Sequence, residues 1–281
     1  HLHQNNVLGA LDAMRSATRA APTEPQPWSE LGSLLREIGQ YEEAAHSFEQ
    51  AIQHGADPEL HGYYLAAVRP GSPVPPPPKR YAEALFDGYA SDFQTHLVEA
   101  LKYSAHTTLL QPLLETGRRY PSALDLGCGT GLCAPLLKKM CDTIDGVDVS
   151  AAMVQQATGS GLYHSVSQND LLPWLRSRNT PADLIVAADV FIYVGELTEV
   201  FAEVARLLSH EGCFAFSVET SEGEGLRLLP SLRYAHSETY IRELAARHGL
   251  KIRSSYHGPI REEQRQPIAG QYFHLGLREP A

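Results

Sequence analysis

Apolar residues in the carboxy-terminal two-thirds of the chain form short continuous runs that alternate with stretches of helical spacing. The run at 184–188, Leu-Ile-Val-Ala-Ala, is typical of a strand buried on both faces. Since a parallel sheet covered by helices buries its strands in this way, the pattern predicts an α/β fold with a doubly wound sheet. The expected strands are 122–127, 143–148, 162–167, 183–188, 212–219, 250–257 and 270–277, and the expected helices are 81–87, 92–115, 131–140, 150–157, 196–208 and 237–248.

The last two expected strands, 250–257 and 270–277, lie too close in sequence for a helix to fit between them. Parallel neighbours need a long crossover, so these two strands are predicted to form an antiparallel hairpin. The complete expectation is a Rossmann-like, seven-stranded, mostly parallel sheet with an antiparallel terminal hairpin.

A pattern of small and large residues near the amino terminus repeats after 34 positions. Ala10, Met14 and Ala17 recur as Ala44, Phe48 and Ala51. The interval and the pattern resemble the tetratricopeptide repeat, with one complete unit at about 25–58 and a candidate first helix at 59–68. Such repeats imply small all-α hairpins with a surface for a protein partner. Because a stack needs about three units to bury its faces, we expect an amino-terminal portion to be missing.

Residues 70–78 read Pro-Gly-Ser-Pro-Val-Pro-Pro-Pro-Pro and predict an extended linker, because proline fixes φ and removes a backbone donor. The expected domains are therefore helical repeats at 1–69, a linker at 70–79 and the α/β domain at 80–281.

The strongest chemical signal follows the first expected strand, where Asp125 is followed by Gly127, Gly129 and Gly131. Glycines allow a tight turn and let a nucleotide-like ligand approach the backbone at the carboxyl end of the strand. A dinucleotide fingerprint would need glycine or alanine where Leu132 stands, and a phosphate-binding P-loop would need a following Gly-Lys-Ser/Thr. Neither is present in the sequence.

The spacing D-x-G-x-G-x-G resembles motif I of class I S-adenosylmethionine (SAM)-dependent methyltransferases. The resemblance implies SAM as cofactor, with Asp148 accepting hydrogen bonds from the ribose hydroxyls; Asp145 is the nearby competitor for that role. The other expected cofactor residues are Asn169 and Asp170 at the adenine amino group, Val149 and Met153 beside the ring, and Asp189 and Val190 at the methionine part. Each acid also has a structural reading as a cap or loop residue, and Met153 as core.

Two further segments, 81–93 and 233–237, narrow the resemblance to a bacterial group of repeat-bearing methyltransferases related to trans-aconitate methyltransferase. In that group the helix at 81–87 would fold over the cofactor, so that Phe86 or Tyr89 could close the site. The repeats and linker depart from trans-aconitate methyltransferase itself, so its substrate is not carried over.

The methyl acceptor should approach over the carboxyl ends of the fourth and fifth strands. The candidates there are Tyr193, Glu219, Arg233, His236 and Tyr272. The expected catalytic residues are His236, Arg233 and Tyr193. His236 could act as a general base, and Arg233 and His236, as potential cations, would suit an anionic acceptor. Surface or capping roles are the alternative for each.

Composition excludes several partners. The net charge of −10 without a basic run argues against nucleic acid, and no apolar stretch reaches the roughly 18 residues of a membrane span. The four cysteines lack paired spacing, so we expect no metal site and a reducing compartment. Without a membrane span in the sequence, we also expect a cytoplasmic protein. The sequence predicts a methyltransferase acting on a carboxylate, hydroxyl or amine of a small-molecule or protein acceptor. The alternative is a SAM-binding protein that catalyses nothing and works through its repeats.

Overall fold

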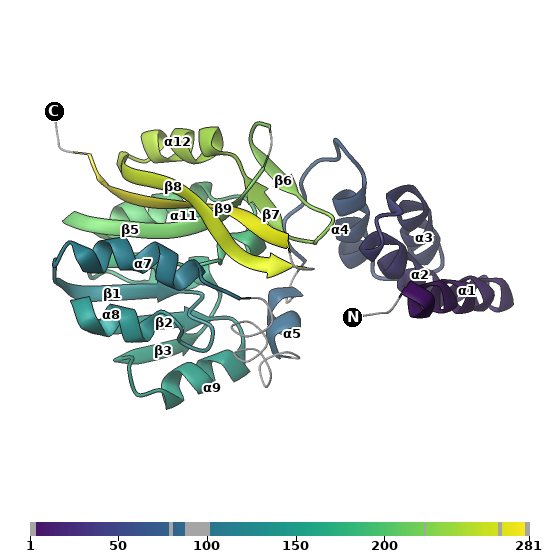
Figure 1. Cartoon of the computed structure of the whole chain (residues 1–281), viewed down its shortest axis with the longest axis horizontal. Helices are drawn as coiled ribbons and strands as arrows, with labels where there is room; N and C mark the ends of the chain where they lie inside the picture. The colour runs from purple at the N-terminus through teal and green to yellow at the C-terminus, as the bar shows by residue number, and fades with distance from the viewer. Residues whose placement is uncertain (1–3, 79–80, 88–101, 222, 264–265, 279–281) are drawn as a thin grey trace. The chain divides into compact units, whose positions relative to one another are not determined.

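The chain divides into two compact units in the computed structural model, which describes residues 4–78, 81–87, 102–221, 223–263 and 266–278 (Figure 1). The first unit comprises His1–Pro78 together with Arg227–Tyr234, and the second comprises Lys79–Leu226 together with Ala235–Ala281. No described helix is long and apolar enough to cross a membrane.

The first unit is built from four helices, each packed on the next along the chain. They are α1 (Gln4–Ala20), α2 (Pro25–Glu37), α3 (Tyr41–Gln53) and α4 (Pro58–Val68). Proline stands in the first turn of α2 and of α4, where the backbone donor it lacks would have no helical partner. The Asp57 side chain caps α4 by accepting from the N–H groups of Glu59 and Leu60.

Helices α2 and α3 approach closely because Gly32 has no side chain. A Cβ at this position would lie 2.6 Å from Cε1 of Phe48, whose ring is fully buried. Leu31 and Leu35 pack in the same core around this ring. A small residue on one helix therefore makes room for a large one on the other.

A segment from the second half of the sequence, residues 227–234, completes the first unit. Leu232 has a left-handed backbone (φ 64°), and its carbonyl accepts a hydrogen bond of 2.7 Å from the buried hydroxyl of Tyr63 on α4. Arg36 on α2 donates to the carbonyl of Pro230 at 2.6 Å. No pattern in the sequence predicts that these residues belong with the helices.

The described residues form a nine-stranded sheet in the order β3-β2-β1-β4-β5-β7-β6, with β9 paired to both β5 and β8. Apart from Arg227, Leu228 and Tyr234 in β6 and β7, its residues belong to the second unit. Its strands are β1 (Tyr120–Leu126), β2 (Cys141–Asp148), β3 (Ser165–Gln168), β4 (Ala182–Ala187), β5 (Leu208–Thr220), β6 (Leu226–Leu228), β7 (Tyr234–His236), β8 (Leu250–Glu263) and β9 (Gln266–Leu277). The first five strands pair in parallel, as β3 with β2, β2 with β1, β1 with β4 and β4 with β5. Strands β8 and β9 form an antiparallel hairpin. The predicted fold class is confirmed.

Two details of the predicted pattern were wrong. The sheet holds nine strands rather than seven, because the short β6 and β7 carry too few residues to show a pattern. The helix expected at 92–115 is not continuous: residues 102–104 are not helical, Lys102 has a left-handed backbone (φ 47°), and the helix begins at Ala105. Residues 88–101 lie outside the described part of the chain.

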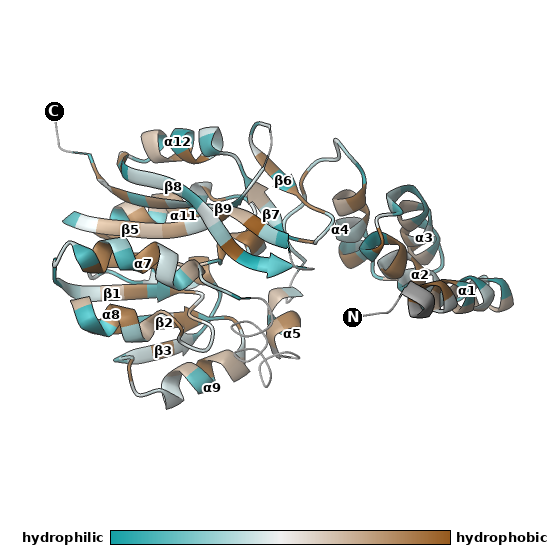
Figure 2. Cartoon of the chain, in the orientation of Figure 1, coloured by the Kyte–Doolittle hydropathy of each residue, from teal (hydrophilic) through white to brown (hydrophobic). Residues whose placement is uncertain are grey.

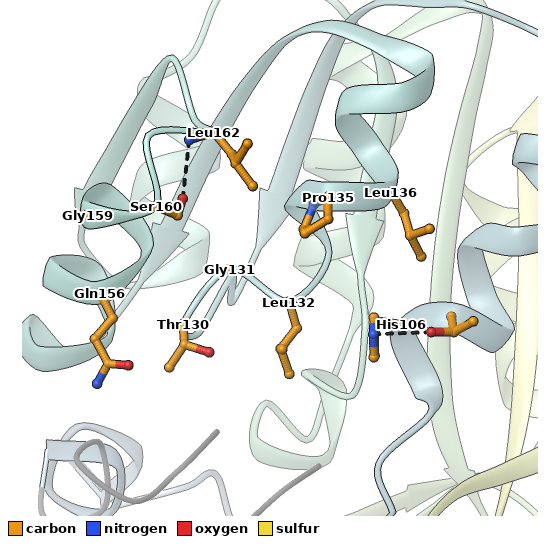
Figure 3. Close-up of a pocket in the computed structure, with 11 residues that line it drawn as sticks. His106, Thr130, Gly131, Leu132, Pro135, Leu136, Gln156, Gly159, Ser160 and Leu162 are labelled. Atoms are coloured by element: carbon orange, nitrogen blue, oxygen red, sulfur yellow. Dashed lines mark hydrogen bonds between the residues drawn. The ribbon is translucent and has the colours of Figure 1, made fainter. Parts of the chain in front are cut away.

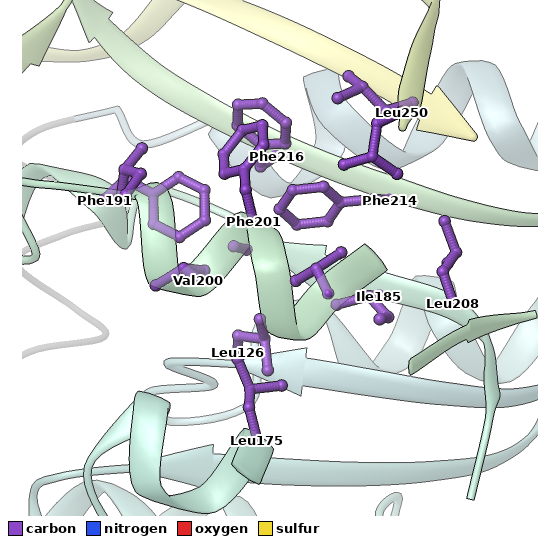
Figure 4. Packing of buried hydrophobic residues seen from close by; sticks show 14 of the residues in the cluster. Leu126, Leu175, Ile185, Phe191, Val200, Phe201, Leu208, Phe214, Phe216 and Leu250 are labelled. Atoms are coloured by element: carbon purple, nitrogen blue, oxygen red, sulfur yellow. The ribbon is translucent and has the colours of Figure 1, made fainter. Parts of the chain in front are cut away.

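Successive side chains of the central strands point to opposite faces and pack in two hydrophobic cores, one on each face of the sheet. On β5, Phe214 and Phe216 pack on the face covered by α10 (Leu171–Ser177), α11 (Thr198–Leu207) and α12 (Glu238–Arg247) (Figure 4). Cys213 and Ala215 face α7 (Ala105–Glu115) and α8 (Ala134–Met140). The helices are amphipathic, with hydrophilic and hydrophobic residues interspersed along α7, α8 and α12 (Figure 2). The helices of this unit are α5 (Tyr81–Asp87), α7 (Ala105–Glu115), α8 (Ala134–Met140), α9 (Ala151–Gly159), α10 (Leu171–Ser177), α11 (Thr198–Leu207) and α12 (Glu238–Arg247), with a 3₁₀ turn η2 (Phe191–Tyr193).

We predict that Gly32→Ala destabilises the first unit although alanine favours helices, because the added methyl group meets the buried Phe48 ring. Overpacking of this kind costs about 1–3 kcal/mol, which exceeds the gain of at most about 1 kcal/mol in helix propensity. Gly62→Ala is the matched control, since a Cβ there has nothing within 4 Å. Urea unfolding followed by far-UV circular dichroism should give a lower midpoint for Gly32→Ala and an unchanged or higher one for Gly62→Ala. Equal midpoints for the two variants would contradict the close approach.

Candidate active site

The predicted glycine loop lies at the carboxyl end of β1, between the ends of β2 and β4. Gly127, Gly129 and Gly131 all have left-handed backbones, with φ of 59°, 53° and 94°. Residues with a Cβ adopt this region only at a cost, so the loop requires its glycines. The strand order reverses at β1 and β4, and ligands of open α/β sheets bind in the crevice at such a point.

The loop after β4 packs directly on the glycine loop. A Cβ on Gly127 would lie 2.8 Å from Cγ2 of Val190, so the two loops meet only because this glycine lacks a side chain. The preceding Asp189 has a left-handed backbone (φ 59°), and its N–H donates to the Oγ of Ser217 at 2.9 Å. Val190 therefore stands against the glycine loop, and Asp189 directly precedes it.

Asp148 holds its carboxylate beside the same loop. One oxygen accepts from the N–H of Gly129 at 2.8 Å and the other from the N–H of Ser150 at 3.0 Å. The competitor Asp145 is engaged elsewhere, with Arg178 at 2.5 Å and His164 at 3.0 Å. Asp148 therefore adjoins the glycine loop, and its expected role at the ribose stays a prediction.

Asp125 lies beneath the loop, with only 1% of its surface exposed. Burial raises the pKa of Asp125 to about 7; the neighbouring Asp148 acts in the same direction, and the hydrogen bond of 2.6 Å from the Tyr163 hydroxyl opposes it. Asp125 is therefore a buried residue next to the loop, held by the Tyr163 hydroxyl.

Tyr163 was not among the predicted site residues, and its ring lies against the glycine loop and β2. A Cβ on Gly131 would lie 3.1 Å from this ring, and one on Gly146 would lie 3.0 Å from it. Gly146 was the available signal, since glycine inside a strand often marks the close approach of another group.

The remaining cofactor candidates surround the end of β2. Val149 is half-buried and Met153 is buried, while Asn169 and Asp170 are exposed, Asp170 standing at the amino end of α10. The backbone N–H of Asn169 donates to the last carbonyl of β2 at 3.0 Å. Tyr89 lies outside the described residues. The roles of these five residues stay predictions.

A pocket of about 690 Å³ adjoins the glycine loop (Figure 3). Its lining comes from α7, α8 and α9 and from the loop residues Thr130, Gly131 and Leu132. The Thr130 hydroxyl is buried and has no hydrogen-bond partner within the described part of the chain. A glycine cradle, an oriented carboxylate and an unpaired buried hydroxyl suit a polar nucleoside ligand such as SAM. Across the described ranges there is no cluster of three or more histidine, cysteine or acidic side chains that could hold a metal ion.

On the acceptor side, Tyr193 stands in η2 just after β4. Its ring packs edge-on against Phe86 of α5, with 5.1 Å between the ring centroids. Helix α5 and the loop after β4 are thus brought together, as the expected closing role of Phe86 requires.

His236 stands at the carboxyl end of β4. Strand β4 pairs with one edge of β5 as far as Phe216, and β9 pairs with the opposite edge as far as Glu219. Strand β7 also pairs with Glu219, whose other edge is taken by β9. Strand β7 therefore lies on the same edge of β5 as β4, beyond the point at Phe216 where the pairing with β4 ends. His236, which pairs with Thr220 in β7, therefore lies where an acceptor residue was expected.

The ring of His236 is fully buried and uncharged at neutral pH. Its Nε2 donates to the carbonyl of Gly195 at 2.7 Å, which leaves a lone pair on Nδ1, and Nδ1 has no partner among the described residues. Burial lowers the pKa of His236 to about 4, although the Gly195 carbonyl and Glu196 act in the opposite direction. His236 can accept a hydrogen bond, but it is a weak base.

The other acceptor candidates occupy different surroundings. Tyr272 is buried in the core, and its hydroxyl donates to the carbonyl of Pro259 at 2.8 Å. Glu219 is buried and paired with Arg261, a residue that the sequence analysis did not single out. Arg233 belongs to the first unit, whereas Tyr193 and His236 belong to the second.

Comparison with known families agrees with this geometry. A model described as "Methyltransferase domain" matches residues 124–216, which contain the glycine loop, Asp148 and the loop after β4. The chain is a SAM-dependent methyltransferase. The enzyme class and the cofactor predicted from the glycine motif are confirmed.

Two curated relatives cover different shares of the enzyme. Malonyl-[acyl-carrier protein] O-methyltransferase of Salmonella typhimurium is 26% identical over 181 residues, which span 62% of this chain and 68% of the relative. Trans-aconitate 2-methyltransferase of Pseudomonas paraeruginosa is 33% identical over 93 residues, which span 32% of this chain and 33% of the relative.

Solved structures confirm the class I fold. The N-methyltransferase NodS from Bradyrhizobium japonicum, in complex with S-adenosylhomocysteine (SAH), superimposes with a TM-score of 0.58 at 17% identity, covering 70% of this chain and 99% of NodS. The 1,6-didemethyltoxoflavin-N1-methyltransferase of Burkholderia thailandensis gives 0.56 at 17% identity, covering 74% of this chain and 93% of that enzyme.

The buried His236 predicts that acid destabilises the fold. The unfolded chain takes up a proton near pH 6.5 and the folded protein near pH 4, so the stability present above pH 6.5 is lost as pH falls through 4. The shift corresponds to roughly 3 kcal/mol. His236→Gln keeps a donor for Gly195 but cannot titrate, so its urea midpoint should fall less between pH 7 and pH 4.5 than that of the wild type. The exposed His210→Gln is the control. If His236→Gln keeps the wild-type pH profile, the buried neutral state is wrong.

Proposed function

We propose that this enzyme transfers the methyl group of SAM to an oxygen of a carboxylate on a small-molecule acceptor. The observation that carries the proposal is the neutral, weakly basic His236 at the carboxyl end of β4. Methyl transfer to a hydroxyl or an ammonium needs a base to remove a proton. A carboxylate is already ionised at neutral pH and needs none.

The glycine loop and its neighbours would bind the cofactor. Bound SAM supplies an electrophilic methyl group on a positively charged sulfur. In our proposal Asp148 accepts from the ribose hydroxyls, Asp170 and Val149 hold the adenine, and Asp189 lies at the methionine part. The two backbone hydrogen bonds to Asp148 support this assignment, because they orient its carboxylate before the ligand arrives.

The acceptor side would work by positioning. In-line displacement requires the nucleophile to be held about 3 Å from the methyl carbon. The Tyr193 hydroxyl can donate a hydrogen bond and is the polar group that we assign to orienting the carboxylate, and Phe86 would exclude water beside Tyr193. Nδ1 of His236 carries a lone pair, so it would accept only from another, protonated group of the acceptor. Arg233 belongs to the first unit, so its expected role as a counter-charge stays a prediction from the sequence.

The relatives support an oxygen acceptor of this class. One is named for O-methylation of a malonyl group and another for trans-aconitate, a carboxylate. We also infer that the four helices of the first unit are of the tetratricopeptide type and offer a surface to a protein partner, and that the enzyme is cytoplasmic, with its four cysteines free and buried.

Calorimetric titration with SAM tests the cofactor half. The wild type should bind, and Asp148→Ala should bind at least tenfold more weakly, because hydrogen bonds to a charged group contribute about 1.5–3 kcal/mol. Asp142→Ala is the matched control, since Asp142 lies at the opposite end of β2 on the surface. A wild type that fails to bind SAM refutes the proposed function.

Labelled methyl transfer tests the acceptor half. The enzyme is incubated with methyl-labelled SAM and a deproteinised bacterial extract, and then with one that retains protein. A carboxylate acceptor predicts label in the small-molecule fraction that mild alkali releases as volatile methanol, because esters hydrolyse and ethers and amines do not. Asp148→Ala should transfer no label above background. Alkali-stable label would indicate a hydroxyl or amine, protein-bound label a protein acceptor, and no label a protein without catalysis; each would overturn the carboxylate assignment.

A further inference from the structure

Arg261 on β8 is a buried cation that has no role in the proposed cofactor binding or methyl transfer. Only 2% of its side chain is exposed. Its Nη1 lies 3.2 Å from both carboxylate oxygens of Asp189, its Nη2 pairs with Glu219, and its Nε donates to Glu263 at 2.8 Å. One guanidinium therefore joins the loop after β4, the end of β5 and the end of β8.

The charge on Arg261 is retained despite its burial. Burial lowers the pKa of Arg261, but Asp189, Glu219 and Glu263 together raise it above the usual arginine value. A planar guanidinium can donate along several edges at once, whereas a lysine ammonium is a single point of charge. The arrangement of acids on different edges therefore specifically requires arginine.

Asp189 is held in an unfavourable conformation by two supports. Its backbone is left-handed, which costs a residue with a Cβ free energy and persists only where the surroundings enforce it. Ser217, which is fully buried on β5, accepts from its N–H, and Arg261 engages its carboxylate. The next residue, Val190, packs on Gly127, so the same turn sets how closely the two loops approach.

We propose that Arg261 is a positioning residue, which fixes the Asp189 turn and thereby shapes the methionine end of the SAM site. The proposal rests on the proposed function for the role of Asp189. Arg261 acts through Asp189 and is not a contact of the cofactor itself.

Calorimetry with SAH on four proteins tests this proposal: the wild type, Arg261→Lys, Asp189→Asn and the double variant. Arg261→Lys keeps the charge but loses the fork, and should raise the Kd of the folded protein about tenfold, whatever the change in its thermal midpoint. Because Arg261 acts through Asp189, the double variant should bind no more weakly than the weaker single variant. Arg253→Lys, an exposed change on the same strand, should leave the Kd within about twofold of the wild type.

The outcomes separate this proposal from the proposed function. No binding by the wild type refutes the function, whereas wild-type affinity in Arg261→Lys, or penalties that multiply in the double variant, refutes the role of Arg261. A purely structural role would lower the thermal midpoint and leave the Kd of the folded protein unchanged. Should Arg261→Lys fail to fold, Ser217→Ala removes the other support of Asp189. An unchanged Kd in Ser217→Ala would overturn the proposal, and a raised one would support it.

Discussion

The contact between Gly127 and Val190 is the constraint on which the candidate site depends. It joins the loops after β1 and β4 at the point where the strand order reverses, and it exists only because Gly127 has no Cβ. The same glycine loop presents the N–H of Gly129 to Asp148, and Asp189 directly precedes Val190. Any larger side chain at Gly127 would separate the two loops and enlarge the cofactor site.

Buried carboxylates at this end of the sheet are each stabilised in a different way. Asp125 accepts from the Tyr163 hydroxyl, and burial brings its pKa to about 7. Asp148 is held by backbone N–H groups, whereas Asp189 and Glu219 share the guanidinium of Arg261. Each support comes from a separate part of the sequence, so the site holds its acids only when the whole sheet is assembled.

The first unit shows that domain membership need not follow the order of the chain. Its helices hold residues 227–234 through polar contacts to main-chain carbonyls, such as that of Leu232. Contacts of this type recognise the path of the backbone rather than a particular side chain. For this reason a sequence pattern could not reveal them, and the proline-rich stretch at 70–78 was the visible boundary.

The sequence by itself determined the fold class, the cofactor and the strand ends at which the site lies. Strand periodicity and the spacing of Gly127, Gly129 and Gly131 suffice, because buried parallel strands and left-handed turns restrict the residues that can form them. Only the tertiary structure decided which groups hold Asp148, namely the N–H groups of Gly129 and Ser150. Tyr163 and Arg261 reach the site from distant strands and loops, and His236 becomes neutral only through burial. Their roles depend on which segments meet in space, and no local pattern of residues records that.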